Sequence, residues 1–154
     1  MISVVPARTE KDLRQAKILF KEYAAALDFG LDFQNFEEEL ADLPGGYAQP
    51  EGCLLLALHR EQVAGCVALR KIGEDICEMK RLFVRPSFRD LGIGKALAQT
   101  VIQEAIKKGY SRMRLDTVPS MKEARGLYKK LGFEPIPPYC RNPIPGAVFL
   151  ELKL

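Results

Sequence analysis

The chain has 154 residues, of which 47% are hydrophobic and 28% charged, and its formal net charge is +3. This length and balance predict one globular domain over residues 1–154, with a core of ordinary size. The small positive charge argues against a dedicated nucleic-acid-binding protein and is compatible with anionic ligands.

The four cysteines, at positions 53, 66, 77 and 140, form no Cys-x-x-Cys pair and have no histidine cluster near them. Three of them lie in apolar, strand-like surroundings, which predicts buried thiols rather than a zinc site or a disulfide framework. We expect no metal and a reducing cytoplasmic environment. No secretory signal pattern is visible, and no apolar run approaches the ~20 residues that span a bilayer.

The first part of the chain predicts a strand followed by two helices. Residues 2–5 form the strand, and Thr9 offers a side-chain oxygen to cap the helix that follows. Apolar residues at helical spacing predict this helix over residues 10–28, with Gly30 at its end. A second short helix is indicated by three apolar residues, Phe33, Phe36 and Leu40.

The middle of the chain predicts the centre of a sheet. Two apolar runs, residues 53–58 and 63–69, are separated by a polar turn and predict a hairpin. Residues 76–84 supply the next strand. The helix after Gly94 carries a broad apolar stripe that suits packing on a sheet, and Gly109 is placed to end it.

The last part predicts a strand at residues 113–116 and a helix at residues 121–131, followed by strands from Phe133 and at residues 148–152. The segment 135–146 between these two strands holds five prolines, which predicts an irregular connector. The resulting order, β-α-α-β-β-β-α-β-α-β-β, predicts one α/β domain with a mixed sheet.

The segment 76–98 carries the clearest functional pattern. A strand stopped by Pro86 leads into a loop rich in Arg and Gly, and a helix begins near Gly92. Gly92 and Gly94 leave room for a ligand close to the backbone, and the first N–H groups of the helix have no internal partners. This arrangement predicts a site for a phosphate-bearing ligand, flanked by the cations Arg85, Arg89 and Lys95.

The spacing of the glycines distinguishes between three known phosphate-binding motifs. A Walker A loop fails because Arg89 replaces its first glycine and Ala96 its Ser/Thr, and a dinucleotide fingerprint fails because Leu97 replaces its third glycine. The remaining pattern, Arg/Gln-x-x-Gly-x-Gly/Ala at residues 89–94, resembles the pyrophosphate loop of the GNAT superfamily of N-acetyltransferases, which bind acetyl-CoA. Residues 124–133 are similar to that superfamily's A-x-x-L-Y-x-x-x-G-F segment.

The resemblance implies a single-domain acyl-CoA N-acyltransferase fold with a mixed, mostly antiparallel sheet flanked by helices. Its fourth and fifth strands would splay apart, and acetyl-CoA would enter the gap as co-substrate. The pantetheine arm would lie along the main chain of three residues of the fourth strand, Leu82, Phe83 and Val84. The pyrophosphate would bind the loop formed by Arg89, Asp90, Leu91, Gly92, Ile93, Gly94 and Lys95.

Tyr128 is the candidate general acid, because its place in the Leu-Tyr-x-x-x-Gly-Phe segment matches the superfamily's acid tyrosine. Its reference pKa of about 10 lies above a thiol's value of about 8.5, so a phenol can protonate the leaving sulfur. The alternative is an aromatic side chain that packs between its helix and the sheet.

Glu78 is the candidate general base, because some members of the superfamily carry a glutamate four residues before the cofactor-binding segment. A carboxylate on a central strand needs a partner or a wet cavity. A structural ion pair with Lys80 is the alternative, and so is an acceptor that arrives as the free base.

Three residues of the proline-rich connector, Tyr139, Arg141 and Asn142, are candidates for acceptor binding. Arg141 could hold a carboxylate through two hydrogen bonds, or could be a solvated loop residue. Phe33, Phe36 and Tyr47 could wall the acceptor pocket or pack in the core. His59, the only histidine, suits a solvated hairpin end. Five cations could instead form a nucleic-acid-binding patch, but no RNA-binding aromatic motif accompanies them. These cations are Lys80, Arg81, Arg85, Arg89 and Lys95.

The sequence thus predicts an N-acetyltransferase that moves the acetyl group of acetyl-CoA to a primary amine by direct attack in a ternary complex. A small-molecule acceptor is favoured over a protein or peptide amine. The alternative class is a non-catalytic acyl-CoA-binding module. No membrane or nucleic-acid partner is expected, and the oligomeric state, a homodimer included, stays open.

Overall fold

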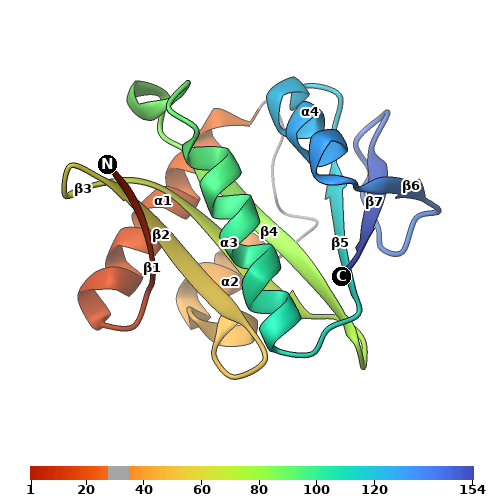
Figure 1. Cartoon of the computed structure of the whole chain (residues 1–154), viewed down its shortest axis with the longest axis horizontal. Coiled ribbons are helices and arrows are strands. Elements are labelled where there is room, and N and C mark those ends of the chain that lie inside the picture. The colour runs from red at the N-terminus through yellow and green to blue at the C-terminus, as the bar shows by residue number, and fades with distance from the viewer. Residues whose placement is uncertain (28–34) are drawn as a thin grey trace.

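The computed structural model describes residues 1–27 and 35–154, which form a seven-stranded sheet with helices on both faces (Figure 1). The helices are α1 (Glu10–Ala26), α2 (Phe36–Asp42), α3 (Ile93–Lys107) and α4 (Lys122–Leu131), with short 3-10 turns η2 (Gly45–Tyr47) and η3 (Pro86–Phe88). The strands are β1 (Ile2–Pro6), β2 (Cys53–His59), β3 (Gln62–Lys71), β4 (Ile76–Val84), β5 (Arg112–Thr117), β6 (Glu134–Ile136) and β7 (Val148–Lys153). The predicted order of elements is confirmed.

The sheet has the order β1-β2-β3-β4-β5-β7-β6, and its neighbours are antiparallel except for β4 and β5. The parallel pairing of β4 and β5 covers only Ile76–Glu78 and Arg112–Arg114. Beyond these residues the two strands diverge (Figure 1), and no described strand pairs with residues 79–84 on that side. The predicted splay between the fourth and fifth strands is therefore confirmed.

A β-bulge bends β4 where the splay begins. The register between β3 and β4 shifts between Cys66 and Ala68, so that Arg81 and Leu82 both face Val67. Arg81 has a φ of 61°, a left-handed conformation that is uncommon for residues other than glycine. Such a bulge increases the local bend and redirects the strand that follows it.

Two apolar clusters cover the two faces of the sheet. Alternation along each strand places Val67 and Leu69 of β3 on the face of α3 and α4, and Cys66 and Ala68 on the face of α1 and α2 (Figure 1). The cluster of α3 includes fully buried Leu97, whose removal from water contributes about 1.5–3 kcal/mol. Both helix layers are thus held by their apolar stripes.

Local sequence signals fix most element ends. Thr9 caps α1 as predicted, in a capping box with Asp12. Gly109 and Gly132 follow α3 and α4 with φ of 90° and 99°, the left-handed conformation that ends many helices. α1 ends at Ala26, and the predicted end at Gly30 and the apolar residue Phe33 lie outside the described residues.

The prediction that residues 135–146 are irregular throughout is wrong at its start, because Pro135 and Ile136 belong to β6. β6 forms an edge of the sheet and pairs only with β7. An edge strand tolerates proline, whose missing N–H group costs the outer side no ladder bond. The rest of the connector forms no described helix or strand.

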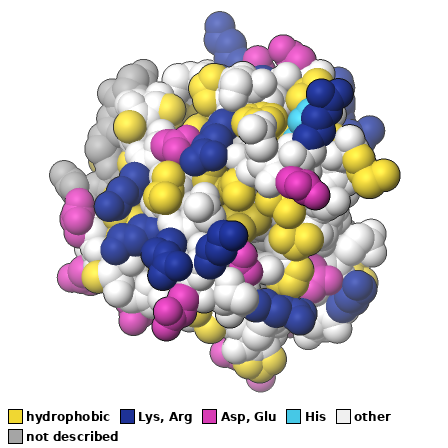
Figure 2. All heavy atoms as spheres, turned by 90° about the vertical axis from the view of Figure 1, so that its left-hand side faces the viewer, with side chains coloured by type: hydrophobic (Ala, Val, Ile, Leu, Met, Phe, Trp, Pro, Cys, Tyr) yellow, Lys and Arg dark blue, Asp and Glu magenta, His cyan; other side chains and the backbone are white. Residues whose placement is uncertain are grey.

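The burial of the cysteines and the distribution of surface charges can be compared with the sequence predictions. Three cysteines are buried thiols, as predicted, and Cys140 is exposed. Figure 2 views the side that carries β1, where acidic and basic side chains are interspersed around an apolar area. No helix within the described ranges is long and apolar enough to cross a membrane.

Candidate active site

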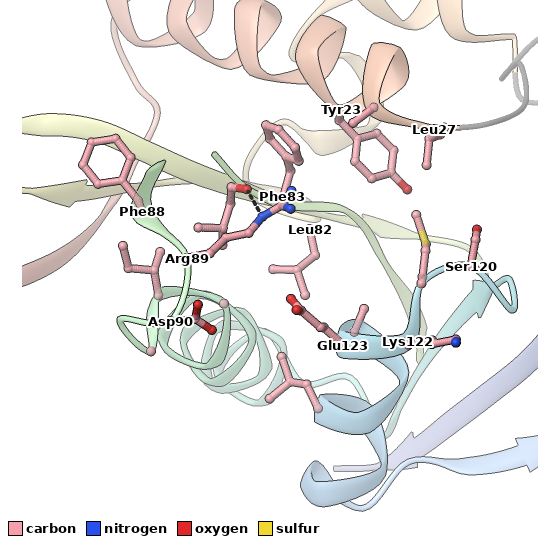
Figure 3. A pocket seen from close by; sticks show the side chains of 18 residues that line it. Tyr23, Leu27, Leu82, Phe83, Phe88, Arg89, Asp90, Ser120, Lys122 and Glu123 are labelled. Carbon is pink, nitrogen blue, oxygen red and sulfur yellow. Dashed lines mark hydrogen bonds between the residues drawn. The ribbon is translucent and has the colours of Figure 1, made fainter. Parts of the chain in front are cut away.

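A cleft of about 660 Å³ opens where β4 leaves β5. Its walls come from the C-terminal end of α1, the last residues of β4, the loop before α3 and the first turn of α4 (Figure 3). Eight of the ten predicted cofactor-binding residues line it: Leu82, Phe83, Val84, Arg89, Asp90, Gly92, Ile93 and Gly94. Leu91 and Lys95 are exposed and are not among the lining residues.

The loop before α3 has the backbone that its composition favours. Asp90 and Gly92 adopt positive φ values of 63° and 80°, and Gly92 is the N-cap residue of α3 without a side-chain cap bond. The first N–H groups of α3 are therefore free for a ligand, at the positive end of the helix dipole. A Cβ atom at Gly94 would meet Val84 at 3.7 Å, so only a small residue keeps this wall of the cleft open.

The cations near this loop have different roles. Arg89 lines the cleft, and its Nε donates to the carbonyl of Val84 at 3.2 Å (Figure 3). Arg85, predicted to flank the phosphate site, forms two hydrogen bonds with Glu22 and one with the carbonyl of Val63. Arg85 therefore attaches β4 to α1 and β3.

The reading of five cations as a nucleic-acid patch does not fit the structure. Arg81 is 3% exposed and Lys80 9% exposed, so neither can be part of a basic surface. The guanidinium of Arg81 lies 5.3 Å from the ring centroid of Phe36 and forms two hydrogen bonds with Glu39. Arg81 is therefore buried between β4 and α2.

Glu78 is a buried carboxylate held from two sides. Its side chain is 1% exposed. Arg70 Nε donates to Oε1 at 2.7 Å, and the Tyr139 hydroxyl donates to Oε2 at 2.6 Å. Lys80, the partner considered from sequence, lies 3.9 Å from Oε1 and is a longer-range neighbour. Arg70 escaped the sequence analysis because its pairing position opposite Glu78 depends on the register of β3 with β4.

Two of the three candidate residues of the connector contact β4 and β5, but neither these three residues nor Glu78 is among the residues that line the cleft. Tyr139 contacts Glu78, and the Asn142 side-chain amide donates to Oδ2 of Asp116 at 3.0 Å. Arg141 is exposed, and no described residue forms an ion pair with it. Burial and the charge of Glu78 raise the pKa of Tyr139 above its ordinary value, so it stays a hydrogen-bond donor at neutral pH.

Tyr128 lies deeper than the cleft wall. It is 7% exposed and is not a lining residue of the cleft. Its ring packs against Phe133 with 5.6 Å between centroids. Burial raises the pKa of Tyr128 above its ordinary value, and Tyr23 and Asp116 add to the effect.

Tyr23, which sequence reasoning missed, points its hydroxyl into the cleft from α1 (Figure 3). Burial raises its pKa to about 12. No local pattern distinguishes Tyr23 from the other members of the α1 stripe, because its role depends on where α1 crosses β4. The same holds for lining residues at the start of α4: Ser120, Met121, Lys122 and Glu123.

The remaining aromatic candidates lie in the core or at its edge. Phe36 and Tyr47 are buried in the cluster beneath α1 and α2, so packing explains both. Phe33 is outside the described residues. His59 ends β2 and packs edge-on against Phe88, with 5.9 Å between centroids.

Comparisons with known proteins agree with this geometry. Residues 16–133 match the model of the acetyltransferase (GNAT) family. An uncharacterized N-acetyltransferase of Schizosaccharomyces pombe is 41% identical over 99% of this chain and 95% of its own length. The N-acetylaspartate synthetase of Homo sapiens is 37% identical over 62% of this chain and 32% of its own.

Solved structures share the fold. An acetyltransferase from Streptococcus agalactiae superposes with a TM-score of 0.80 at 20% identity, covering 99% of this chain and 98% of that one. The PaiA N-acetyltransferase from Thermoplasma acidophilum, solved in complex with coenzyme A, gives 0.74 at 18% identity, covering 100% and 99%. With its family model, its relatives and its fold in agreement, the chain belongs to the acetyltransferase (GNAT) family and is an acyltransferase.

Proposed function

We propose that this protein transfers the acetyl group of acetyl-CoA to the primary amine of a small molecule, by direct attack in a ternary complex. The observation that carries the proposal is the cleft between the open edge of β4 and the N-terminus of α3. This cleft joins a strand edge that no described strand pairs with to the first N–H groups of α3. An acyl-CoA carries amides that suit the strand edge and a pyrophosphate that suits the helix N–H groups. We propose residues 1–154 as one catalytic domain.

The walls of the cleft fit the parts of the cofactor. On the β5 side the main chain of Leu82 and Val84 has no described strand partner, although the Val84 carbonyl accepts from Arg89. This edge can therefore pair with the amides of the pantetheine arm. The first turn of α3 and the loop at Arg89–Gly94 suit the pyrophosphate. Support comes from the family and from a structural neighbour solved with coenzyme A.

The reaction is balanced without a further reactant. The amine nitrogen forms a bond to the thioester carbonyl carbon, the carbon–sulfur bond breaks, the nitrogen loses one proton and the sulfur gains one. Tyr128 is proposed to supply the proton to sulfur, since burial keeps it protonated at neutral pH. Glu78 is proposed to take up the amine proton through the hydroxyl of Tyr139, which accepts one proton while donating its own.

A small acceptor is favoured by the contacts of the connector with β4 and β5. The connector is attached to Glu78 through Tyr139 and to Asp116 through Asn142, so it lies against both strands beside the gap. Relatives with named acceptors include N-acetylaspartate synthetase, and a structural neighbour is named for ribosomal-protein alanine acetylation. Buried free thiols at Cys53, Cys66 and Cys77 agree with a reducing cytoplasmic compartment.

The test has two measurements on the same protein. Calorimetric titration with acetyl-CoA should give saturable binding, and a screen of amines with a thiol-release readout should give turnover for at least one acceptor. Binding of acetyl-CoA without turnover for any small amine or peptide would support a non-catalytic binding module instead. Turnover with peptides alone would move the acceptor to the protein class.

A further inference from the structure

The ammonium group of Lys80 is buried, and residues 1–27 and 35–154 offer it no close acceptor. Its side chain is 7% exposed, and the nearest carboxylate oxygen of these residues, Oε1 of Glu78, lies 3.9 Å away. That oxygen already accepts from Arg70 at 2.7 Å, and the other oxygen of Glu78 accepts from Tyr139. No described residue accepts a hydrogen bond from Nζ of Lys80. An ammonium has three donors, and a buried charge is costly unless it is paired, so this cation suits an anionic group of a ligand.

Asp116 lies on the other side of the same gap. The paired part of β4 and β5 ends at Glu78 and Arg114, and Lys80 and Asp116 each stand two residues farther along their strands. Oδ2 of Asp116 accepts from Asn142 at 3.0 Å, and no described residue donates to Oδ1. Asp116 is half-buried, so part of it remains exposed, although neither Asp116 nor Lys80 is among the residues that line the cleft.

The charge of Asp116 influences Lys80 and the phenols near the gap. Burial lowers the pKa of Lys80, while Glu78 and Asp116 oppose this shift. Burial is the largest cause of the raised pKa values of Tyr23 and Tyr128, and the charge of Asp116 adds to both, so it acts on a hydroxyl of the cleft and on the buried hydroxyl of Tyr128. One cation and one carboxylate, each with hydrogen-bonding capacity that no described residue fills, thus lie two residues beyond the paired part of β4 and β5.

We propose that the acceptor is a free α-amino acid, whose carboxylate binds Lys80 and whose amino group lies against Asp116. This assignment rests on the proposed transferase function and names the acceptor class for it. An α-amino acid is a small primary amine that carries a carboxylate one carbon away. A polyamine would bring a second cation toward Lys80, and a peptide N-terminus has no carboxylate beside its amine, so both fit the pair less well.

The roles of the two residues differ. Lys80 holds a group that takes no part in the bond changes, so it contributes to substrate binding and orientation. Asp116 accepts a hydrogen bond from the amine and directs the nitrogen lone pair toward the thioester. Orientation of this kind is worth most when the reacting atoms are already close, as in a ternary complex.

The experiment compares acceptors that differ only in the carboxylate. Each amino acid of a panel is assayed beside its α-carboxamide and its decarboxylated amine, with acetyl-CoA and a thiol-release readout. At least one amino acid should show kcat/KM about tenfold or more above both analogues, because a site that pairs a charged group rejects ligands without it. An amide or decarboxylated amine that reacts equally well overturns the assignment.

Variants assign the preference to Lys80. Lys80→Met keeps the length and apolar stem, so it should raise KM for the amino acid and bring the preference over the carboxamide to within about threefold. Lys80→Arg should retain most of the preference. Unchanged affinity for acetyl-CoA confirms that the Lys80→Met protein is folded and keeps its cofactor cleft. A preference that survives in folded Lys80→Met overturns the role of Lys80.

Asp116 and the proposed function are tested by separate results. Asp116→Asn retains an oxygen that can accept from Asn142, and it should raise KM for the amino acid without changing the affinity for acetyl-CoA. An unaltered KM overturns the placement of the amine. If acetyl-CoA binds but no amine in the panel, amino acids included, releases CoA, the transferase proposal itself fails and the acceptor assignment fails with it.

Discussion

Tyr139 donates its hydroxyl hydrogen to Oε2 of Glu78 across 2.6 Å, although 61 residues separate the two along the chain. Arg70 donates to the other oxygen at 2.7 Å. Two separate segments therefore hold one carboxylate that is 1% exposed. This contact attaches the proline-rich connector to β4 beside the gap, so it affects both the stability of the fold and the shape of the candidate site.

Tyr139→Phe should lower the free energy of unfolding by about 1–3 kcal/mol, because a buried charged acceptor loses a donor while the ring remains. Urea unfolding measures this change. Tyr110→Phe is the control, since the Tyr110 hydroxyl donates to the neutral carbonyl of Glu51 at 2.6 Å. The control should cost about 0.5–1.5 kcal/mol. Equal losses in the two variants would mean that the charge of Glu78 adds nothing to its bond with Tyr139.

Glu78→Gln should lower kcat/KM and remove the acidic limb of the pH–rate profile, if Glu78 accepts the amine proton. An amide has nearly the same shape but cannot take up a proton. Glu151→Gln is the matched control, because Glu151 accepts from Arg114 at 2.8 Å on the side of β5 away from the gap. A Glu78→Gln profile that keeps its acidic limb would limit Glu78 to holding Arg70 and Tyr139.

Gly94→Val should weaken acetyl-CoA binding at least tenfold, or about 1.4 kcal/mol, as measured by calorimetric titration. The Cβ atom of the new valine fits at 3.7 Å from Val84. Its two methyl groups, however, add bulk to the part of the cleft wall that Gly94 and Val84 form. Gly94 is a better position for this substitution than Gly92, where a φ of 80° would strain the backbone with any side chain.

The control for this variant is Gly126→Val. Gly126 lies in α4, away from the lining of the cleft, and a Cβ atom there meets nothing within 4 Å. It introduces the same β-branched residue into a helix with the same cost in helix propensity. Unchanged affinity in folded Gly94→Val, equal to that of the control, would contradict the placement of the pyrophosphate.

Local patterns predict the elements of this fold, because caps and apolar periodicity act over a few residues. Thr9 and the glycines after α3 and α4 are examples. The loop before α3 is predictable for the same reason, since its Arg and Gly residues and the helix that follows are contiguous. Eight of the predicted cofactor-binding residues accordingly line the cleft.

The proposed acceptor side is less predictable, because it depends on contacts between segments far apart in sequence. Arg70 meets Glu78 only through the register of two strands. Tyr139 and Asn142 reach Glu78 and Asp116 through a connector without periodicity, so their partners cannot be derived from spacing. Tyr23 depends on how α1 crosses the sheet. Contacts of this kind depend on the tertiary packing of the whole chain rather than on local sequence.

Tyr128→Phe should lower kcat by ~10²–10⁴ while the Kd for acetyl-CoA hardly changes, if the hydroxyl protonates the leaving sulfur. The ring and its packing against Phe133 remain, so the fold should be retained. Single-turnover kinetics and calorimetry separate the two quantities. Tyr23→Phe is the comparison, because the Tyr23 hydroxyl points into the cleft, whereas Tyr128 is not among its lining residues (Figure 3).

The pH dependence follows from burial of both phenols. Burial disfavours the phenolate, so the pKa of Tyr128 lies above its ordinary value, and that of Tyr23 is about 12. Each remains a proton donor up to at least pH 10, and neither should produce a basic limb in the rate below that pH. A large loss of kcat in Tyr23→Phe with normal Tyr128→Phe kinetics would transfer the acid role to α1. Parallel loss of acetyl-CoA affinity in Tyr128→Phe would make Tyr128 a residue that positions the cofactor.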